Sequence, residues 1–158
     1  MNISQGLGAV YDYNLLQLAK GNNWMSSFGN ATPTAGESTI AQLRNQGADT
    51  RKIRVRKAFI IPGAVMNVNM AIGSTNYGSN FFSQSCENTI GAGSFAEPAG
   101  GHNAAPVGTI LRTFPSVPTS GLLIDNIDFV FNLTSVFLFW GATVNTALSG
   151  TIWWQEYF

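Results

Sequence analysis

Ile127-Asp128-Phe129-Val130-Phe131-Asn132-Leu133-Thr134 is the stretch that decides the fold class, because every second residue in it is bulky and apolar. Side chains two residues apart share one face of a β-strand, so this period is typical of a strand with one buried face. Val136–Trp140 and Leu148–Gln155 continue the pattern, and short turn-like segments separate the three runs. This alternation predicts that five of the apolar residues point into the interior, namely Ile127, Phe129, Phe131, Ile152 and Trp154.

Further period-two runs precede this region. Arg51–Ile61 ends at a Pro-Gly turn, and Met66–Ile72 alternates Met, Val and Ile with Asn and Ala. Residues 73–118 are dense in Gly, Ser, Asn and Pro, which favours long loops with short strands. Nothing alternates strands with helices in the βαβ manner, so we expect an all-β, antiparallel jelly-roll or β-sandwich domain over residues 51–158.

The first 50 residues lack a sustained period and are expected to form an irregular N-terminal arm, a docking segment with one or two short helices. Tyr11, Leu15 and Leu18 have helical spacing, and Gly21 follows as a helix stop. Ser38–Asn45 is a second candidate for a helical turn, because it holds Ile40 and Leu43.

The composition limits the kinds of function. The 158 residues suit one domain, and charged residues make up only 10% of them, with eight acids balancing eight bases. Ample apolar and aromatic content excludes a disordered chain, and zero net charge gives no overall attraction to nucleic acid or anionic lipid. Residues 129–155 carry no charge, but their polar interruptions and β-branched residues favour strands, so no membrane span is expected.

One charge cluster stands out. Five of the eight bases fall between residues 51 and 57, with no acid among them: Arg51, Lys52, Arg54, Arg56 and Lys57. On a strand, alternate bases would line one face and Ile53 and Val55 the other. We expect this stripe to be a partner-docking site, with two alternatives: an edge strand that charge protects from pairing, and a nucleic-acid contact. No aromatics interleave with the bases, which disfavours a groove for single-stranded nucleic acid.

The chain ends in bulky residues on both faces of its last strand. Trp153, Trp154, Tyr157 and Phe158 are expected to form an oligomer interface, because contiguous exposed apolar surface usually marks a contact. Coverage of Trp153 and Tyr157 by the N-terminal arm would satisfy the same need for burial. The prediction is a homo-oligomer, a trimer.

Catalytic and metal-binding chemistry finds little support. Cys86 and His102 are the single cysteine and histidine, they lie in no nucleophile motif, and together they cannot fill a tetrahedral zinc site. Asp125 and Asp128 are three residues apart, which on a strand puts them on opposite faces and favours a turn role. We therefore expect no enzyme, no cofactor and no metal.

The Gly/Asn/Ser/Thr-rich, charge-poor composition, the irregular arm and the last strand Ser149-Gly150-Thr151-Ile152-Trp153-Trp154-Gln155-Glu156 resemble small virion proteins of bacteriophages. The resemblance implies a capsid cement or decoration protein, or a fibre head, of jelly-roll or sandwich type. Such a trimer would sit on the capsid surface and bind the major capsid protein or another virion protein, with residues 1–50 docking and residues 51–57 near the shell. The alternative is a receptor- or carbohydrate-binding β module whose loop aromatics, Tyr77, Phe81 or Phe82, stack on a ligand.

Overall fold

A computed structural model describes residues 22–46, 50–77, 80–82, 85–86, 94–106, 108–132 and 134–157, with residues 80, 81, 85 and 86 described by their backbone. These residues form no helix and twelve strands: β1 (Asn23–Gly29), β2 (Ser38–Asn45), β3 (Lys52–Pro62), β4 (Met66–Gly73), β5 (Asn80–Phe81), β6 (Ser85–Cys86), β7 (Ala96–Asn103), β8 (Thr109–Val117), β9 (Leu122–Ile124), β10 (Phe129–Phe131), β11 (Val136–Gly141) and β12 (Leu148–Tyr157).

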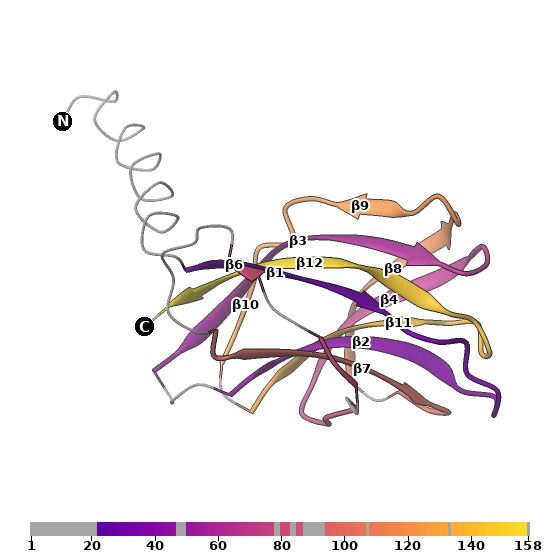
Figure 1. Cartoon of the computed structure of the whole chain (residues 1–158), viewed down its shortest axis with the longest axis horizontal. Coiled ribbons are helices and arrows are strands. Elements are labelled where there is room, and N and C mark those ends of the chain that lie inside the picture. The colour runs from indigo at the N-terminus through magenta and orange to yellow at the C-terminus, as the bar shows by residue number, and fades with distance from the viewer. Residues whose placement is uncertain are drawn as a thin grey trace.

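Two antiparallel sheets lie face to face and form a β-sandwich (Figure 1). The first sheet has the order β10-β3-β12-β1-β6, with β9 also paired to β3, and the second has the order β5-β7-β2-β11-β4-β8. Most pairings join strands far apart in the chain, among them β1 with β12, β2 with β11, β3 with β9, β10 and β12, and β4 with β8. The all-β, antiparallel class predicted from the alternation is confirmed.

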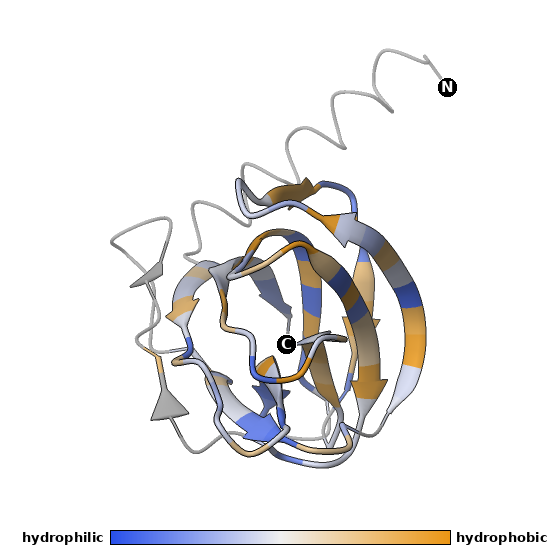
Figure 2. Cartoon of the chain, turned by 90° about the vertical axis from the view of Figure 1, so that its right-hand side faces the viewer, coloured by the Kyte–Doolittle hydropathy of each residue, from blue (hydrophilic) through white to orange (hydrophobic). Residues whose placement is uncertain are grey.

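The alternation also places the core between the sheets. Apolar and polar residues alternate along the strands in Figure 2, and the apolar set of both sheets merges into one cluster. Phe131, Ile152 and Trp154 are buried as predicted, at 4%, 2% and 0% exposure. Ile127 and Phe129 are half-buried and pack against the same cluster.

The helical turn predicted at Ser38–Asn45 is wrong, because this segment is strand β2, hydrogen-bonded to β11 and to β7. Ile40 and Leu43 have helical spacing, but they point to opposite faces of the strand. Leu43 joins the core, whereas Ile40 packs with Val136 and Leu138 of β11 in a second apolar cluster on the other face of the sheet. A strand buried on both faces therefore imitated a helical pattern.

The expected extent of the N-terminal arm needs the same correction. β1 and β2 both come from residues 1–50, and each lies inside a sheet, so residues 23–45 belong to the sandwich. Trp24 and Phe28 on β1 reach the core, with the small polar Ser26 between them, which weakened the period-two signal. The helix expected at Tyr11–Leu18 lies outside the described residues.

β7 is a strand that the sequence pattern missed, in a region expected to be mostly loop. Its buried positions are small, including Ala96, Ala99 and Gly100, so no bulky alternation marks them. A Cβ atom at Gly100 would lie 2.1 Å from the side-chain oxygen of Asn30, so a larger residue here would displace this side chain from its place against β7.

Candidate functional site

The basic residues of β3 lie on the face of the first sheet that is turned away from the second sheet. Ile53 and Val55 are fully buried in the core, so Lys52, Arg54 and Arg56 point outward, as the alternation predicted.

A β-bulge extends this basic stripe by one residue. On β12, Trp153 lies opposite Lys57 and Trp154 lies opposite Val55, so Arg56 is an extra residue without an opposite on that strand. Such an insertion shifts the side-chain alternation by one position. Arg56 and Lys57 therefore both face outward, and the inward set continues at Ala58 and Ile60.

β3 is not an edge strand, so the reading of the stripe as a charge-protected edge is wrong. β12 pairs with one side of β3 along ten positions. On the other side β10 pairs with residues 53–55 and β9 with residues 58–60. The bases therefore project from the interior of the sheet, where neighbouring strands hold their backbone in place.

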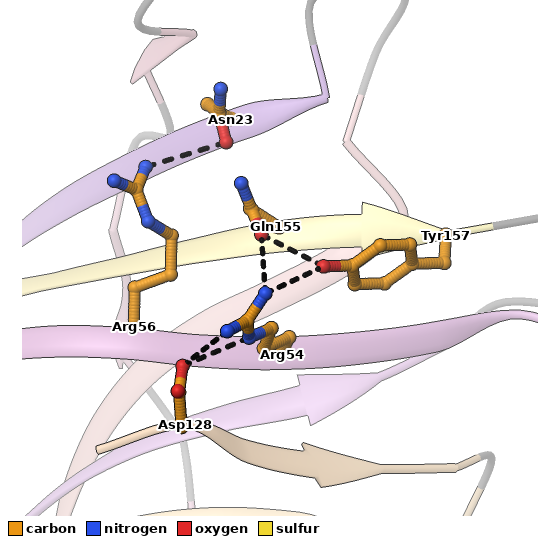
Figure 3. Close-up of polar contacts among 6 residues, drawn as sticks. All are labelled: Asn23, Arg54, Arg56, Asp128, Gln155 and Tyr157. Carbon is orange, nitrogen blue, oxygen red and sulfur yellow. Dashed lines mark hydrogen bonds and ion pairs between the residues drawn. The ribbon is translucent and has the colours of Figure 1, made fainter. Parts of the chain in front are cut away.

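Arg54 is the centre of a polar network on this face (Figure 3). Its Nε and Nη2 donate to one oxygen of Asp128, at 2.9 and 2.6 Å, and Nη1 donates to the hydroxyl of Tyr157 at 3.4 Å and to Gln155 at 3.5 Å. The Tyr157 hydroxyl in turn donates to Gln155 at 2.8 Å. The hydrogen bond to Tyr157, together with Asp128, raises the pKa of Arg54 against the opposing effect of burial. Arg54 is thus fixed in one orientation and its charge is balanced by Asp128.

The other bases have different surroundings. Arg56 donates to the side-chain oxygen of Asn23 on β1 at 3.4 Å. The ammonium of Lys57 lies 4.7 Å from the ring centre of Trp153, a cation–π contact. Lys52 at the start of the strand is exposed. Arg51 precedes the strand and stacks over the ring of Phe95, so it does not join the stripe directly.

The predicted docking site and the predicted oligomer interface meet on one surface. Trp153 and Tyr157 are half-buried on the outer side of β12 and contact Lys57 and Arg54 of β3. We call this surface the β3–β12 face; it consists of Lys52, Arg54, Arg56, Lys57, Trp153, Gln155 and Tyr157.

Trp154 does not belong to this face. It is 0% exposed within the single chain and lies in the core, so its assignment to an oligomer interface is wrong. The reason is the alternation itself, because neighbouring residues of a strand face opposite sides. Phe158 lies outside the described residues.

Sequence reasoning missed three partners on this face. Asn23, Gln155 and Asp128 are polar residues from β1, β12 and the β9–β10 loop, and their contacts with the arginines depend on strand order. One signal was present: the loop was expected to be a turn, and Asn126 and Asp128 do have positive φ, of 55° and 49°. That backbone shape lets Asp128 reach Arg54.

The residues considered for catalysis or metal binding, Cys86, His102, Asp125 and Asp128, lie on two strands and in one loop. Cys86 lies on β6, which pairs with β1 in the first sheet, whereas His102 lies on β7 in the second sheet and is half-buried. Asp125 and Asp128 are exposed in the β9–β10 loop. Within the part of the chain that the structure describes, no three histidine, cysteine or acidic residues gather where they could hold a metal ion.

The aromatics proposed to stack on a ligand are engaged in packing where they are described. Tyr77 packs against the apolar cluster of Ile40 and Val136, and Phe82 packs against the core, 6.3 Å from the ring of Phe28. The side chain of Phe81 lies outside the description. A polar pocket of about 380 Å³ does lie nearby on the second sheet, lined by Arg44, Asn45, Gln46, Ser74, Asn76, Thr134 and Val136.

The fold and the face define a two-sheet β-sandwich that carries a cationic, aromatic patch on a rigid strand. No family model matches the chain, and no curated protein and no solved structure resembles it significantly. Among the described residues there is no helix of the length and apolarity needed to cross a membrane.

Proposed function

We propose that the protein is a virion structural protein of the cement or decoration type, which attaches to a larger protein shell through its β3–β12 face. The observation that carries the proposal is the composition of this face. Besides the neutralised Arg54, this face carries three bases, Lys52, Arg56 and Lys57, on a strand held from both sides, and Lys57 lies over the ring of Trp153. A rigid patch that combines cationic and aromatic side chains suits an acidic protein surface.

The strand pairing supports a jelly-roll arrangement for this protein. In a jelly roll, a long antiparallel hairpin is folded over, so the first strand pairs with the last and the second with the next to last. If β9 and β10 count as one interrupted strand, the pairs β1·β12, β2·β11, β3·β9/β10 and β4·β8 follow this scheme. Jelly rolls are common in viral capsid and lectin domains, which agrees with a place on the capsid surface.

On this proposal the protein acts through buried interface area and catalyses no reaction. Apolar contact at Trp153 would contribute about 25 cal/mol per Å² of buried area, a term that salt does not weaken. Lys52 and Lys57 would add contacts with acidic side chains of the major capsid protein or another shell protein. Because exposed charges act over about 10 Å at 0.1 M salt, this second term weakens as salt is added.

The test is co-sedimentation of the purified chain with capsids of the virus that carries its gene, over a salt series. We expect saturable binding at fixed stoichiometry. At low salt, K52Q/K57Q should weaken binding about tenfold, since each exposed ion pair contributes about 0.2–1 kcal/mol. R112Q removes one base from the second sheet and serves as the control. Absence of saturable binding, or equal effects of K52Q/K57Q and R112Q, would contradict the proposal.

A probe of defined chemistry separates two kinds of partner. Poly-L-glutamate imitates an acidic protein surface, and a single-stranded oligonucleotide imitates nucleic acid. We expect the wild-type chain to bind poly-L-glutamate at low salt and K52Q/K57Q to lose that binding. Tighter binding to the oligonucleotide at equal salt would instead favour a nucleic-acid partner.

A receptor- or carbohydrate-binding module is the second candidate, and the polar pocket on the second sheet favours it. The amides of Asn45 and Asn76 and the hydroxyls of Ser74 and Thr134 are groups that hydrogen-bond to sugar hydroxyls, and Val136 provides an apolar surface. Binding to a glycan array that N76A abolishes, without binding to capsids, would favour this function over the first.

A further inference from the structure

The polar pocket of the second sheet lies at one end of three neighbouring strands. β2 and β4 end beside it and β11 begins there, and Arg44 pairs with Val136 in the ladder between β2 and β11. Val136 contributes the apolar part of the lining. The other lining residues are uncharged and polar: Asn45, Gln46, Ser74, Asn76 and Thr134. The pocket therefore holds one cation among groups that form hydrogen bonds.

Arg44 has donor capacity that the protein does not use. Its Nη2 lies 2.8 Å from an oxygen of Glu97 on β7, but the angle of this ion pair does not suit a hydrogen bond, and its Nε is buried without a hydrogen-bond partner. Glu97 is the only polar partner of this guanidinium in the part of the chain that the structure describes. Because a guanidinium has five N–H donors, the donors of Nη1 are available to a ligand in the pocket.

Gln42 on β2 fixes the rim of the pocket. This side chain is 1% exposed, and it uses both ends of its amide. Its Nε2 donates to the side-chain oxygen of Asn76, and its Oε1 accepts from the N–H of Tyr77 at 2.9 Å. Tyr77 also packs against the apolar cluster that contains Val136. The rim is thus in place before a ligand binds, which lowers the entropic cost of binding.

Thr134 forms the opposite part of the lining in a strained backbone shape. Its φ is 67°, in the left-handed region that β-branched residues rarely adopt. The N–H of Ser135 donates to the carbonyl of Asn132 at 3.3 Å and closes the turn around Thr134. Strain of this kind is concentrated at binding sites, where the surrounding structure holds it. Here it places an exposed threonine, with its hydroxyl, at the pocket.

We propose that this pocket binds a sugar that carries one carboxylate, a uronic or sialic acid. Nη1 of Arg44 would donate to the carboxylate, and the hydroxyls of Ser74 and Thr134 and the amide of Gln46 would bond to the sugar hydroxyls. A carboxylate only accepts hydrogen bonds, so it matches the unused guanidinium donors. Phosphates and nucleic acids fit less well, because the lining offers a single cation whose charge Glu97 already balances in part.

This inference names the ligand class of the second candidate function and rests on that function. Titrations of the purified chain, followed by NMR chemical shifts, use glucuronate, N-acetylneuraminate, the methyl ester of glucuronic acid, and glucose. We expect the two acids to bind in the millimolar range, as a single sugar in an open pocket should, and the ester and glucose to bind at least tenfold more weakly. Equal binding of glucuronate and its ester would overturn the inference but leave carbohydrate binding standing. Absence of binding by all four would contradict both.

A pair of arginine variants tests the role of Arg44. R44Q should weaken glucuronate binding at least tenfold, because it removes the charged donor to the carboxylate. R112Q is the matched control, since Arg112 lies on β8 over the ring of Phe114 and away from the pocket lining. Circular dichroism and the Tm verify that both variants fold. A folded R44Q that binds glucuronate as tightly as R112Q does would overturn the proposal.

Two further variants separate a binding role from a merely structural one, and they decide the question if R44Q does not fold. E97Q removes the negative charge that competes for Arg44, so it should strengthen glucuronate binding about fivefold and leave glucose binding unchanged. T134G removes the hydroxyl and suits the positive φ, so it should weaken glucuronate binding while the Tm does not fall. Weaker glucuronate binding in E97Q, or unchanged binding in T134G, would contradict the assigned contacts.

Discussion

Glu156 is a buried carboxylate that joins the two sheets, and its removal is a sharp test of the structure. It is 3% exposed near the end of β12. Its oxygens accept hydrogen bonds from the indole of Trp154 at 3.0 Å, the hydroxyl of Ser94 at 2.5 Å, and the backbone N–H groups of Ala96 and Phe95 at 3.2 and 3.3 Å. The carboxylate therefore attaches the last strand of the first sheet to the start of β7 in the second.

The structure sets the size of the effect of E156A. The Ser94 hydroxyl can still accept from the N–H of Ala96, as it already does at 3.1 Å. All four donors lose the carboxylate, although the Ser94 hydroxyl can still donate to the carbonyl of Ala96 at 3.3 Å. A lost buried acceptor costs about 1–3 kcal/mol per donor, so with the indole of Trp154 and the N–H of Phe95 most affected we expect a loss of about 4 kcal/mol in the free energy of unfolding. That is a large part of the roughly 5–15 kcal/mol that stabilises an ordinary domain.

Urea unfolding followed by tryptophan fluorescence measures this loss. With a slope of about 2 kcal/mol per molar urea, the midpoint should fall by roughly 2 M. E156Q keeps one acceptor oxygen and should lie between E156A and the wild type. E37A, at a half-buried glutamate before β2, is the control and should shift stability by less than about 0.5 kcal/mol. If E156A and E37A unfold at the same urea concentration, the inferred role of the carboxylate is wrong. If E156A does not fold, the midpoint of E156Q is compared with that of E37A instead, and equal midpoints would contradict the inferred role.

Three further predictions follow from the backbone shape at Gly150, from the burial of the two tryptophans, and from the separation of Cys86 and His102 on different sheets. G150A should cost at least about 3 kcal/mol in urea unfolding, because Gly150 has a φ of 152° and a Cβ there would lie 1.9 Å from a carbonyl oxygen of β3. W154A should cost about 3–5 kcal/mol and W153A about 1 kcal/mol or less, since the first ring is in the core and the second on the surface; equal losses would contradict the assignment of faces. C86A and H102A should each leave capsid binding within twofold of the wild type, and a folded variant that loses it would reveal chemistry that the proposed function does not contain.

The sequence predicted the strands in which bulky apolar residues lie on one face and small or polar residues on the other. In β3, β4, β10 and β12 the bulky residues recur at every second position, and this local pattern follows from strand geometry. It failed where bulky residues are buried on both faces, as in β2, or where the buried residues are small, as in β7. In those strands neighbouring strands, not the local pattern, decide that the chain is extended.

The same division applies to the candidate site. The sequence by itself determined that five bases cluster at residues 51–57, that alternate ones share a face, and that aromatics end the chain. The tertiary structure decided that β3 is interior, that Trp154 is core while Trp153 lies under Lys57, and that Asp128 neutralises Arg54. These facts depend on strand order and on one inserted residue at Arg56. Both arise from pairing between segments about 100 residues apart, which side-chain periodicity within one segment does not encode.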